Sequence, residues 1–302
     1  METFTFPTSG RSRCAAWYLK ADTDELVGPH GRPCVVMGHG FAATRDSGLL
    51  PFAERFTAAG FDVVLFDYRG FGTSPGKRRQ DVNHRKHRQD YHAAVAWARA
   101  LPRVDMTRIV LWGSSYSGGH VLAVAAQDAM VAAVISQGAA VDGLAALRSL
   151  YAGAGIGKLA ALVGAGLRDL GRALTGRPPH MIPVVGAVGS DAVISSPDSL
   201  EGYRSIMGPS FRNEMCGRGI LRIAANRPVL AADRIDCAAL YILAERDNVA
   251  PTSAVRDAAR RTGVRAEIES YDCGHFDIYT GAAFEKSVSR QVEFLRRHVG
   301  VR

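Results

Sequence analysis

Short apolar runs alternate with longer segments of helical periodicity along most of this 302-residue chain. Most of the runs are apolar at nearly every position rather than at every second one, which is typical of strands that are buried on both faces. Strands of this kind, separated by helices, predict an α/β fold with a mostly parallel twisted sheet and helices on both faces. The strands are expected at residues 34–37, 62–66, 109–112, 133–136, 238–243 and 266–271.

Helical segments separate these strands or follow them. Residues 49–59 and 90–100 have the helical period and end close to a glycine and a proline, respectively. A helix over residues 283–298 is expected near the end of the sequence. Near the start, residues 3–6 and 14–19 have the pattern of an antiparallel hairpin at the edge of the sheet.

Residues 141–236 interrupt the alternation. This segment is rich in Gly and Ala, has helical patches at 151–174 and 198–207, and contains no convincing strand. It is longer than an ordinary connection between a strand and a helix. We therefore expect a helical cap inserted late in the sheet, over a core formed by residues 1–140 and 237–302. An ordinary helical layer on the sheet is the alternative.

The formal net charge of +8 raises the question of a nucleic-acid partner. A groove for single strands needs aromatic side chains between its cations as stacking platforms. The basic stretch of this chain has none, so we interpret it as a solvated or acid-paired loop and expect no nucleic-acid partner. Its cations are Lys77, Arg78, Arg79, Arg85, Lys86 and Arg88.

The cysteines and the apolar stretches bear on the cellular compartment. The five cysteines are far apart and lack the C-x-x-C spacing of metal or redox sites. The first residues lack the basic and apolar parts of a secretory signal. The longest apolar stretches are short or carry Lys158 or Arg168, so we expect no stable membrane insertion. These features predict a reduced, cytoplasmic protein and leave a homo-oligomer open.

The strongest chemical signal lies at residues 113–117, which read GSSYS between an apolar run and a helical pattern. A serine raised on a tight strand-to-helix turn is the layout of a nucleophile elbow. The residues on both sides of the serine must be small, because a larger side chain would collide with the strand or the helix. Gly113 meets this requirement, whereas Ser117 stands where glycine is usual. The candidate nucleophile is Ser115.

A serine nucleophile needs a base and an orienting acid, which arrive in the order Ser, acid, His on this layout. His275 follows the last expected strand directly and is the candidate base. Asp247 lies in the loop after the preceding strand and is the candidate acid. Glu245 and Asp142 are its competitors, and an Asx turn before the next helix is the purely structural role for Asp247.

Backbone N–H groups must stabilise the negative oxygen that forms during acyl transfer. One donor is expected from Tyr116, the residue after the nucleophile. The second is expected from Phe41, in the glycine-containing turn that follows the first parallel strand. We interpret His39 in the same turn as an orienting residue and not as a base.

Two other features are open to a chemical interpretation. Asp67 ends a strand, but the Arg-Gly-Phe-Gly turn after it favours a structural ion pair over a catalytic acid. His84, His87 and His92 have a spacing that could suggest a metal, but the nearby Arg and Lys side chains would repel a cation. No metal site is therefore expected.

Taken together, these motifs resemble the α/β-hydrolase superfamily over nearly all of the chain outside the expected cap. The Ser-Tyr pair of the elbow is similar to the X-prolyl dipeptidyl peptidase and cocaine esterase branch. The turn at 67–74 resembles the serine aminopeptidase and lysophospholipase-like branches. The motifs are GHGF at 38–41, DYRGFGTS at 67–74, GSSYS at 113–117, Asp247, and GH at 274–275.

The resemblance implies a triad of Ser115, Asp247 and His275 and no cofactor. We expect a serine hydrolase that cleaves a carboxylic ester through an acyl-enzyme intermediate. The apolar cap indicates a small-molecule substrate with a hydrophobic portion.

Other chemistries on the same triad are a thioesterase, a carbon–carbon bond hydrolase, and a peptidase or amidase. A non-catalytic binding protein would be expected to have lost a triad member. The peptidase would need a cap carboxylate to hold the substrate amine, for which Asp191, Asp198, Glu201 and Glu214 are available.

Overall fold

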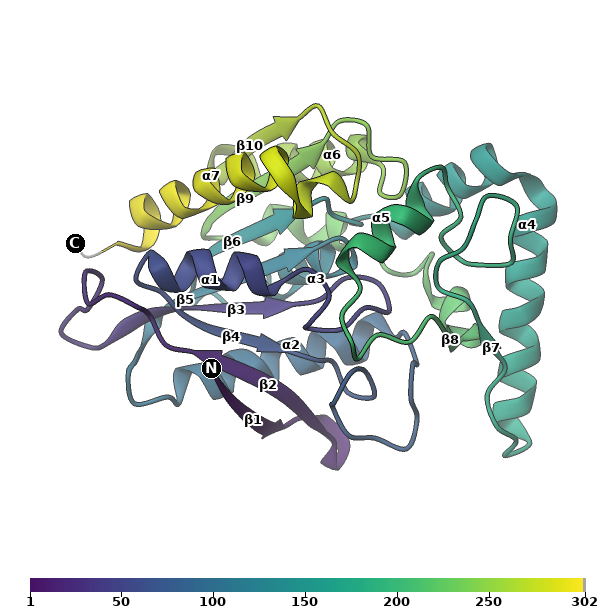
Figure 1. The fold of residues 1–302 in the computed structure, drawn as a ribbon, viewed down its shortest axis with the longest axis horizontal. Coiled ribbons are helices and arrows are strands. Elements are labelled where there is room, and N and C mark those ends of the chain that lie inside the picture. The colour runs from purple at the N-terminus through teal and green to yellow at the C-terminus, as the bar shows by residue number, and fades with distance from the viewer. Residues whose placement is uncertain (301–302) are drawn as a thin grey trace.

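A computed structural model describes residues 1–300 and has an eight-stranded sheet at its centre (Figure 1). The strand order is β1-β2-β4-β3-β5-β6-β9-β10. The strands from β4 to β10 pair in parallel, whereas β2 pairs antiparallel with both β1 and β4. The bounds are β1 Glu2–Pro7, β2 Arg13–Leu19, β3 Arg32–Gly38, β4 Asp62–Phe66, β5 Val104–Ser114, β6 Val131–Gln137, β9 Ala238–Ala244 and β10 Ala266–Tyr271.

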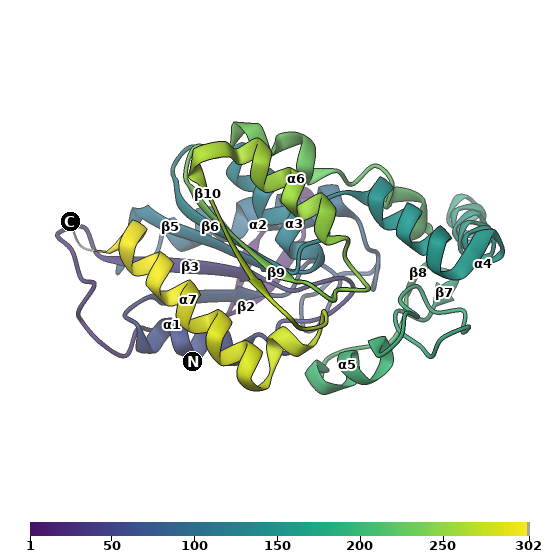
Figure 2. The same cartoon turned by 90° about the horizontal axis from the view of Figure 1, so that it is seen from above.

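Helices cover both faces of this sheet (Figure 2). Helices α1 and α7 lie on one face, and α2, α3 and α6 lie on the other. The predicted α/β fold with a mostly parallel sheet and an antiparallel edge hairpin is therefore confirmed. The bounds are α1 Leu50–Ala58, α2 His84–Arg99, α3 Tyr116–Ala125, α6 Thr252–Thr262 and α7 Gly281–Val299. Short 3-10 turns lie at Ser9–Arg11, Gly217–Arg222, Pro228–Arg234, Gly263–Arg265 and Asp277–Tyr279.

Helix α2 starts earlier than the sequence pattern predicted. The side chain of Asn83 accepts hydrogen bonds from the backbone N–H groups of Arg85 and Lys86, so it caps the helix six residues before the expected start at 90. The second half of the basic stretch is therefore helical rather than a loop. The cap residue precedes a run of polar residues, which hid the helix from a search based on apolar periodicity.

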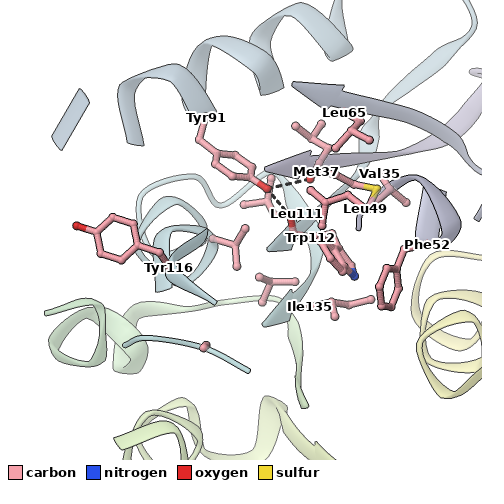
Figure 3. Packing of buried hydrophobic residues seen from close by; sticks show 14 of the residues in the cluster. Val35, Met37, Leu49, Phe52, Leu65, Tyr91, Leu111, Trp112, Tyr116 and Ile135 are labelled. Carbon is pink, nitrogen blue, oxygen red and sulfur yellow. Dashed lines mark hydrogen bonds between the residues drawn. The ribbon is translucent and has the colours of Figure 1, made fainter. Parts of the chain in front are cut away.

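The core lies between the sheet and the helices on its two faces (Figure 3). Trp112 on β5 packs against Phe52 of α1, with ring centroids 5.1 Å apart. Its indole N–H donates to Gln291 of α7 over 2.7 Å, so the one polar atom of this buried ring is satisfied. On the other face, the buried hydroxyl of Tyr91 donates to the carbonyl of Val36 over 3.1 Å. These contacts fix α1, α7 and α2 on β5, which leads to the candidate nucleophile, and on its neighbour β3.

Most of residues 141–236 lie beside one end of the sheet, with α4 outermost, whereas the turn at Pro228–Arg234 packs against α3 and α6 (Figures 1 and 2). The segment contains α4 Gly143–Leu174 and α5 Ser199–Ile206, close to the two expected helical patches. Helix α4 starts before residue 151 because the Asp142 carboxylate caps it by accepting from the N–H of Leu144 over 2.9 Å. The expectation of no strand was wrong, since β7 Met181–Ile182 and β8 Met215–Cys216 form a short antiparallel pair.

By length and composition alone, α4 is long and apolar enough to cross a membrane. This differs from the expectation that the longest apolar stretches are too short, or carry Lys158 or Arg168, to span a bilayer. The helix is broken at Gly155, where φ is 77° and ψ is 173°. Beyond the break, Lys158 donates to the carbonyl of Ala192 over 2.6 Å, and Asp169 forms a buried ion pair with Arg218. Polar contacts therefore attach this helix to the rest of the segment.

Candidate active site

Ser115 lies at the turn between β5 and α3, with φ of 56° and ψ of −120°. A positive φ is unfavourable for a residue with a side chain and marks a strained turn. The turn is held by the N–H of Ser115, which donates to the carbonyl of Gln137 at the end of β6 over 2.8 Å. A Cβ atom on Gly113 would lie 2.4 Å from the carbonyl oxygen of Ser117, so only glycine fits two positions before the serine.

The other two serines of the motif point into the protein. The hydroxyl of Ser114 lies 2.5 Å from that of Tyr279, and the hydroxyl of Ser117 accepts from Tyr68 over 3.0 Å. Both serines are buried, whereas Ser115 is half-buried. The small size of Ser117 lets it take the place of the usual glycine, and its hydroxyl satisfies a buried tyrosine.

The structure brings the three expected triad residues together. His275 Nε2 lies 3.1 Å from Ser115 Oγ, and His275 Nδ1 lies 2.6 Å from Asp247 Oδ2. Both distances are within the range of a hydrogen bond. This arrangement lets the imidazole accept the serine proton at one nitrogen while the carboxylate holds the other.

The two competing acids lie in other interactions. Glu245 forms an ion pair with Arg256 on α6. Asp142 caps α4 and pairs with Arg227 at 2.9 Å. Burial is opposed by the Arg227 guanidinium and by backbone N–H donors, and the pKa of Asp142 is lowered on balance. Neither carboxylate contacts His275 among the described residues.

Asp247 performs its structural role and contacts the histidine at the same time. Its Oδ1 atom accepts hydrogen bonds from the N–H groups of Val249 and Ala250, over 2.8 and 2.7 Å. Its Oδ2 atom is left for His275. The Asx turn therefore orients the carboxylate toward the imidazole, so the two roles considered from the sequence are compatible.

The expected oxyanion donors flank Ser115. Tyr116 is the first residue of α3, so its N–H has no acceptor within the helix. Phe41 follows Gly40, where an added Cβ would lie 3.2 Å from the Cβ of Ser115. In the described part of the chain the N–H of Phe41 makes no hydrogen bond. The aromatic rings of Phe41 and Tyr116 meet edge to face at 5.3 Å, which holds the two backbone segments side by side.

A narrow apolar pocket reaches Ser115 and His275. Its volume is about 20 Å³, which is room for roughly one water molecule. The hydroxyl of Tyr203, on α5, donates to the carbonyl of Phe41 over 2.8 Å and so ties this helix to the oxyanion turn. The lining comprises Gly40, Phe41, Ala43, Ser47, Leu49, Ser115, Ile194, Tyr203, Ile206, His275, Phe276 and Tyr279. The lining residues Ile194, Tyr203 and Ile206 could not be predicted from the sequence, because nothing in their spacing indicates which site they cover.

A wider cavity of about 480 Å³ opens on the other side of His275 and is more polar. Two of the cap carboxylates considered from the sequence, Asp198 and Glu201, line it. Glu214, by contrast, pairs with Arg212 at 2.5 Å. The imidazole therefore lies between a small apolar pocket and a larger polar one.

Asp67 forms the structural ion pair that its turn indicated. Its partner is Arg45, whose guanidinium and backbone N–H contact the carboxylate at 2.9 and 2.7 Å. Burial nevertheless raises the pKa of Asp67 to about 6. The carboxylate also accepts from the N–H of Thr73, so it holds the turn at 67–74 against the chain that follows His39.

A cluster of buried imidazoles lies behind the elbow. His87 stacks on Tyr68 with ring centroids 4.2 Å apart, and His120 packs on Tyr116 at 4.6 Å. Neither ring nitrogen of His87 or His120 has a hydrogen-bond partner among the described residues. His39 and His84 are buried nearby, whereas His92 is half-buried and contacts Gln127. The cluster was missed because these residues lie on three different elements.

This cluster predicts a loss of stability in mild acid. Burial lowers the pKa of His39 and of His84 to about 4 and lowers the pKa of His87 and His120 well below the usual value of 6.5. Between about pH 6.5 and 4, these imidazoles are therefore protonated in the unfolded chain and neutral in the folded chain. The free energy of unfolding accordingly falls as the pH falls. Each imidazole contributes up to about 1.4 kcal/mol per pH unit.

Asp67, whose pKa is raised to about 6, acts in the opposite direction but is a single group. Urea unfolding at pH 7 and pH 5 measures the net effect, with a lower midpoint expected at pH 5. His87→Phe keeps the stacking on Tyr68 and removes one titrating group, so it should flatten the dependence. An unchanged midpoint between the two pH values would contradict this account.

Comparisons with known proteins agree with the fold and identify the family. A family model described as serine aminopeptidase, S33, matches residues 29–278. A quorum-quenching protein, AidA from Acinetobacter baumannii, is 38% identical, covering 96% of this chain and 93% of that protein. A thiohydrolase, aneE from Aspergillus aculeatus, is 28% identical, covering 88% of this chain and 87% of that protein. The crystal structure of the α/β hydrolase GrgF from Penicillium superposes with a TM-score of 0.80 at 24% identity, covering 99% of this chain and 98% of that chain.

The family match spans the elbow, the candidate acid and the candidate base, and a relative above 30% identity extends over nearly the whole chain. The resemblance to the α/β-hydrolase superfamily, and within it to the serine aminopeptidase branch, is therefore confirmed. The chain belongs to the α/β-hydrolase family, in the group described as serine aminopeptidase, S33.

Proposed function

We propose that this hydrolase cleaves a carboxylic ester, with Ser115 as nucleophile, His275 as general base and acid, and Asp247 as the acid that orients the imidazole. The observation that carries the proposal is the continuous chain of hydrogen-bond distances from Asp247 through His275 to Ser115. The overlap of these residues with the family match supports it.

In the proposed reaction, His275 Nε2 takes the proton of Ser115 while the oxygen attacks the ester carbonyl. The N–H groups of Phe41 and Tyr116 would stabilise the oxyanion of the tetrahedral intermediate. His275 then returns the proton to the leaving alcohol, and an acyl group stays on Ser115. Water, activated by the same imidazole, attacks this acyl-enzyme and releases the carboxylic acid.

The proposed substrate enters under a cap formed by residues 141–236. Ile194, Tyr203 and Ile206 from this segment line the apolar pocket, whose volume is about 20 Å³. A pocket of this size holds about one water molecule, so we infer that the side chains lining it, including those from α5, shift apart when an acyl chain binds. An apolar lining of this kind suits a hydrophobic acyl portion, and the polar cavity beyond His275 suits the leaving group.

One relative is named as a thiohydrolase and the other only for quorum quenching, so their names do not identify the bond that this chain cleaves. A thiohydrolase and a quorum-quenching protein are both similar along most of their length. A panel of p-nitrophenyl esters of increasing chain length, a lactone, acyl thioesters and aminoacyl nitroanilides separates the candidate reactions. We expect the highest kcat/KM among the oxygen esters. A preference for aminoacyl nitroanilides would instead favour the amidase, with Asp198 or Glu201 holding the substrate amine.

Ile206→Ala should lengthen the preferred acyl chain. Ile206 lies on α5 and is almost fully buried against the pocket, so truncation leaves room for additional methylene groups. Each newly buried methylene adds about 0.8 kcal/mol, which is roughly a fourfold gain in kcat/KM for the longer ester relative to the shorter one. Leu230→Ala, an exposed leucine outside the pocket, is the matched control. An unchanged chain-length profile in Ile206→Ala would place the acyl chain elsewhere.

A further inference from the structure

The outer face of α4 carries a row of exposed apolar side chains beyond the break at Gly155. The exposed fractions are 66% for Ile156, 57% for Leu167 and 81% for Leu174. Water-facing leucine and isoleucine side chains are common one at a time, whereas a continuous row marks an interaction surface. We call this row the α4 seam; it comprises Ile156, Ala160, Val163, Leu167, Leu170 and Leu174.

The seam has the spacing of a coiled coil. Its members follow one another at steps of 4, 3, 4, 3 and 4 residues. This alternation repeats every seven residues and keeps one line of side chains facing a partner helix. A helix that only covers its own domain usually has a broader apolar face directed inward.

The inward face of α4 is occupied by different residues. Asp169 pairs with Arg218 there, Lys158 donates to backbone carbonyls, and Gly166 packs against Leu221. Ile156, Leu167 and Leu174 therefore contribute little to attaching α4 to its own chain, whereas Val163 and Leu170, at 37% and 41% exposed, are partly covered by it. Most of the apolar surface of the seam faces water in the isolated molecule.

A row of glycines lies next to the seam. Gly157, Gly164 and Gly171 are seven residues apart, and a Cβ at any of them would meet no atom within 4 Å. Glycine weakens a helix interior, and the isolated chain gives no steric reason for it at these positions. Removing side chains beside a seam lets two helix backbones approach closely, which is a reason that a partner helix would supply.

We propose that the protein forms a two-fold dimer in which α4 pairs antiparallel with α4 of a second copy through this seam. Centring the pair between Val163 and Leu167 matches every seam residue with another. Ile156 faces the partner's Leu174, Ala160 faces the partner's Leu170, and Val163 faces the partner's Leu167. An isologous contact of this kind needs no residue outside the seam and its glycines.

The charges on α4 and the area that the contact would bury are consistent with a second copy of this chain at the α4 seam. Neither the seam nor the glycine row contains a charged residue, and the antiparallel arrangement keeps the exposed Arg168 side chains of the two copies apart. Two helices of this length in contact bury on the order of 1,000 Å², which is the lower end for a specific pair. The dimer is therefore expected to dissociate at micromolar concentrations.

An anionic bilayer is the competing occupant, because the seam is apolar and the chain has a net charge of +8. Binding to a bilayer would not explain the glycine row, since lipid does not require a close approach of helix backbones. It would also not explain the seven-residue repeat of the seam, since an interfacial helix presents a broad apolar face. The glycines and the spacing both favour a second copy.

Charge substitutions on the full chain test the pairing. Analytical ultracentrifugation from 1 to 100 µM, on the order of the expected dissociation constant, should show a reversible dimer for the natural sequence. Val163→Glu alone and Leu167→Lys alone should each give a monomer. The double variant Val163→Glu with Leu167→Lys should restore the dimer, because each glutamate then faces the partner's lysine.

Each result has a definite meaning. The two introduced charges lie four residues apart on one helix and can also pair within it, so circular dichroism and thermal unfolding of all three variants check folding separately. A dimer that the double variant restores from folded, monomeric single variants supports antiparallel pairing. A natural chain that stays monomeric at the highest concentration would overturn the proposal. Flotation with phosphatidylglycerol vesicles that is lost in Leu167→Lys, from a chain that is monomeric without vesicles, would assign the seam to a bilayer. Because the seam lies outside the pocket, hydrolysis by these variants reports separately on the proposed function.

Discussion

Ser115→Ala is expected to lower kcat by roughly 10⁵- to 10⁶-fold on whichever ester is the best substrate, which is the loss seen when a triad nucleophile is removed. The variant lacks the oxygen that forms the acyl-enzyme, while the proposed oxyanion donors and the pocket are retained. Alanine has the same Cβ, so the strain at φ of 56° is unchanged and the fold should be retained. Steady-state kinetics with thermal unfolding of the same samples measures both effects.

Ser117→Ala is the matched control for this variant, two residues along the same motif. It leaves the hydroxyl of Tyr68 without its acceptor, so it should cost about 1–3 kcal/mol of stability. It should keep most of the turnover because Ser117 does not contact His275. Turnover that survives in Ser115→Ala but is lost in Ser117→Ala would show that the nucleophile has been assigned to the wrong serine.

Asp247→Asn is expected to lower kcat by about 10³- to 10⁴-fold with little change in stability. The amide oxygen can still accept from Val249 and Ala250, so the Asx turn is kept. The amide nitrogen would replace Oδ2 beside His275 Nδ1 and would favour the tautomer that cannot accept the serine proton. A large loss of kcat with an unchanged unfolding temperature would show that Asp247 acts in catalysis and does not only support its loop.

Glu245→Gln and Asp142→Asn are the controls for the acid, since both were candidates from the sequence. Each removes a charge from an ion pair away from His275, with Arg256 or Arg227. Both should keep turnover near that of the natural chain. If either control lost as much turnover as Asp247→Asn, the residue changed in that control would be the catalytic acid instead of Asp247.

The fold could be predicted well from the sequence because most strands of its sheet are short and apolar on both faces, as expected for a parallel sheet covered by helices. Every expected strand of the sheet is present, and β10 Ala266–Tyr271 has the expected bounds. The errors lie where side-chain capping decides the start of a helix. Asn83 begins α2 in a polar stretch that precedes the apolar periodicity, and the Asp142 cap begins α4 at Gly143, before the expected start at 151.

The triad could be proposed from the sequence because each member follows a strand, and parallel strands bring their carboxyl ends to one edge. The pocket could not be predicted in the same way. Tyr203 contacts Phe41, which is 162 positions away in the sequence, and no periodic pattern encodes that contact. The imidazole cluster was equally hidden, because it depends on how α2 and α3 pack together behind the elbow.

Labelling with a fluorophosphonate probe, read by peptide mass spectrometry, tests the central claim most directly because it needs no knowledge of the substrate. The arrangement of Asp247, His275 and Ser115 predicts a single adduct, on the oxygen of Ser115. Labelling should be lost in His275→Ala, in which Ser115 remains but has no base. An adduct on Ser114 or Ser117, or labelling of Ser115 that persists at full rate in His275→Ala, would contradict the assignment of this triad.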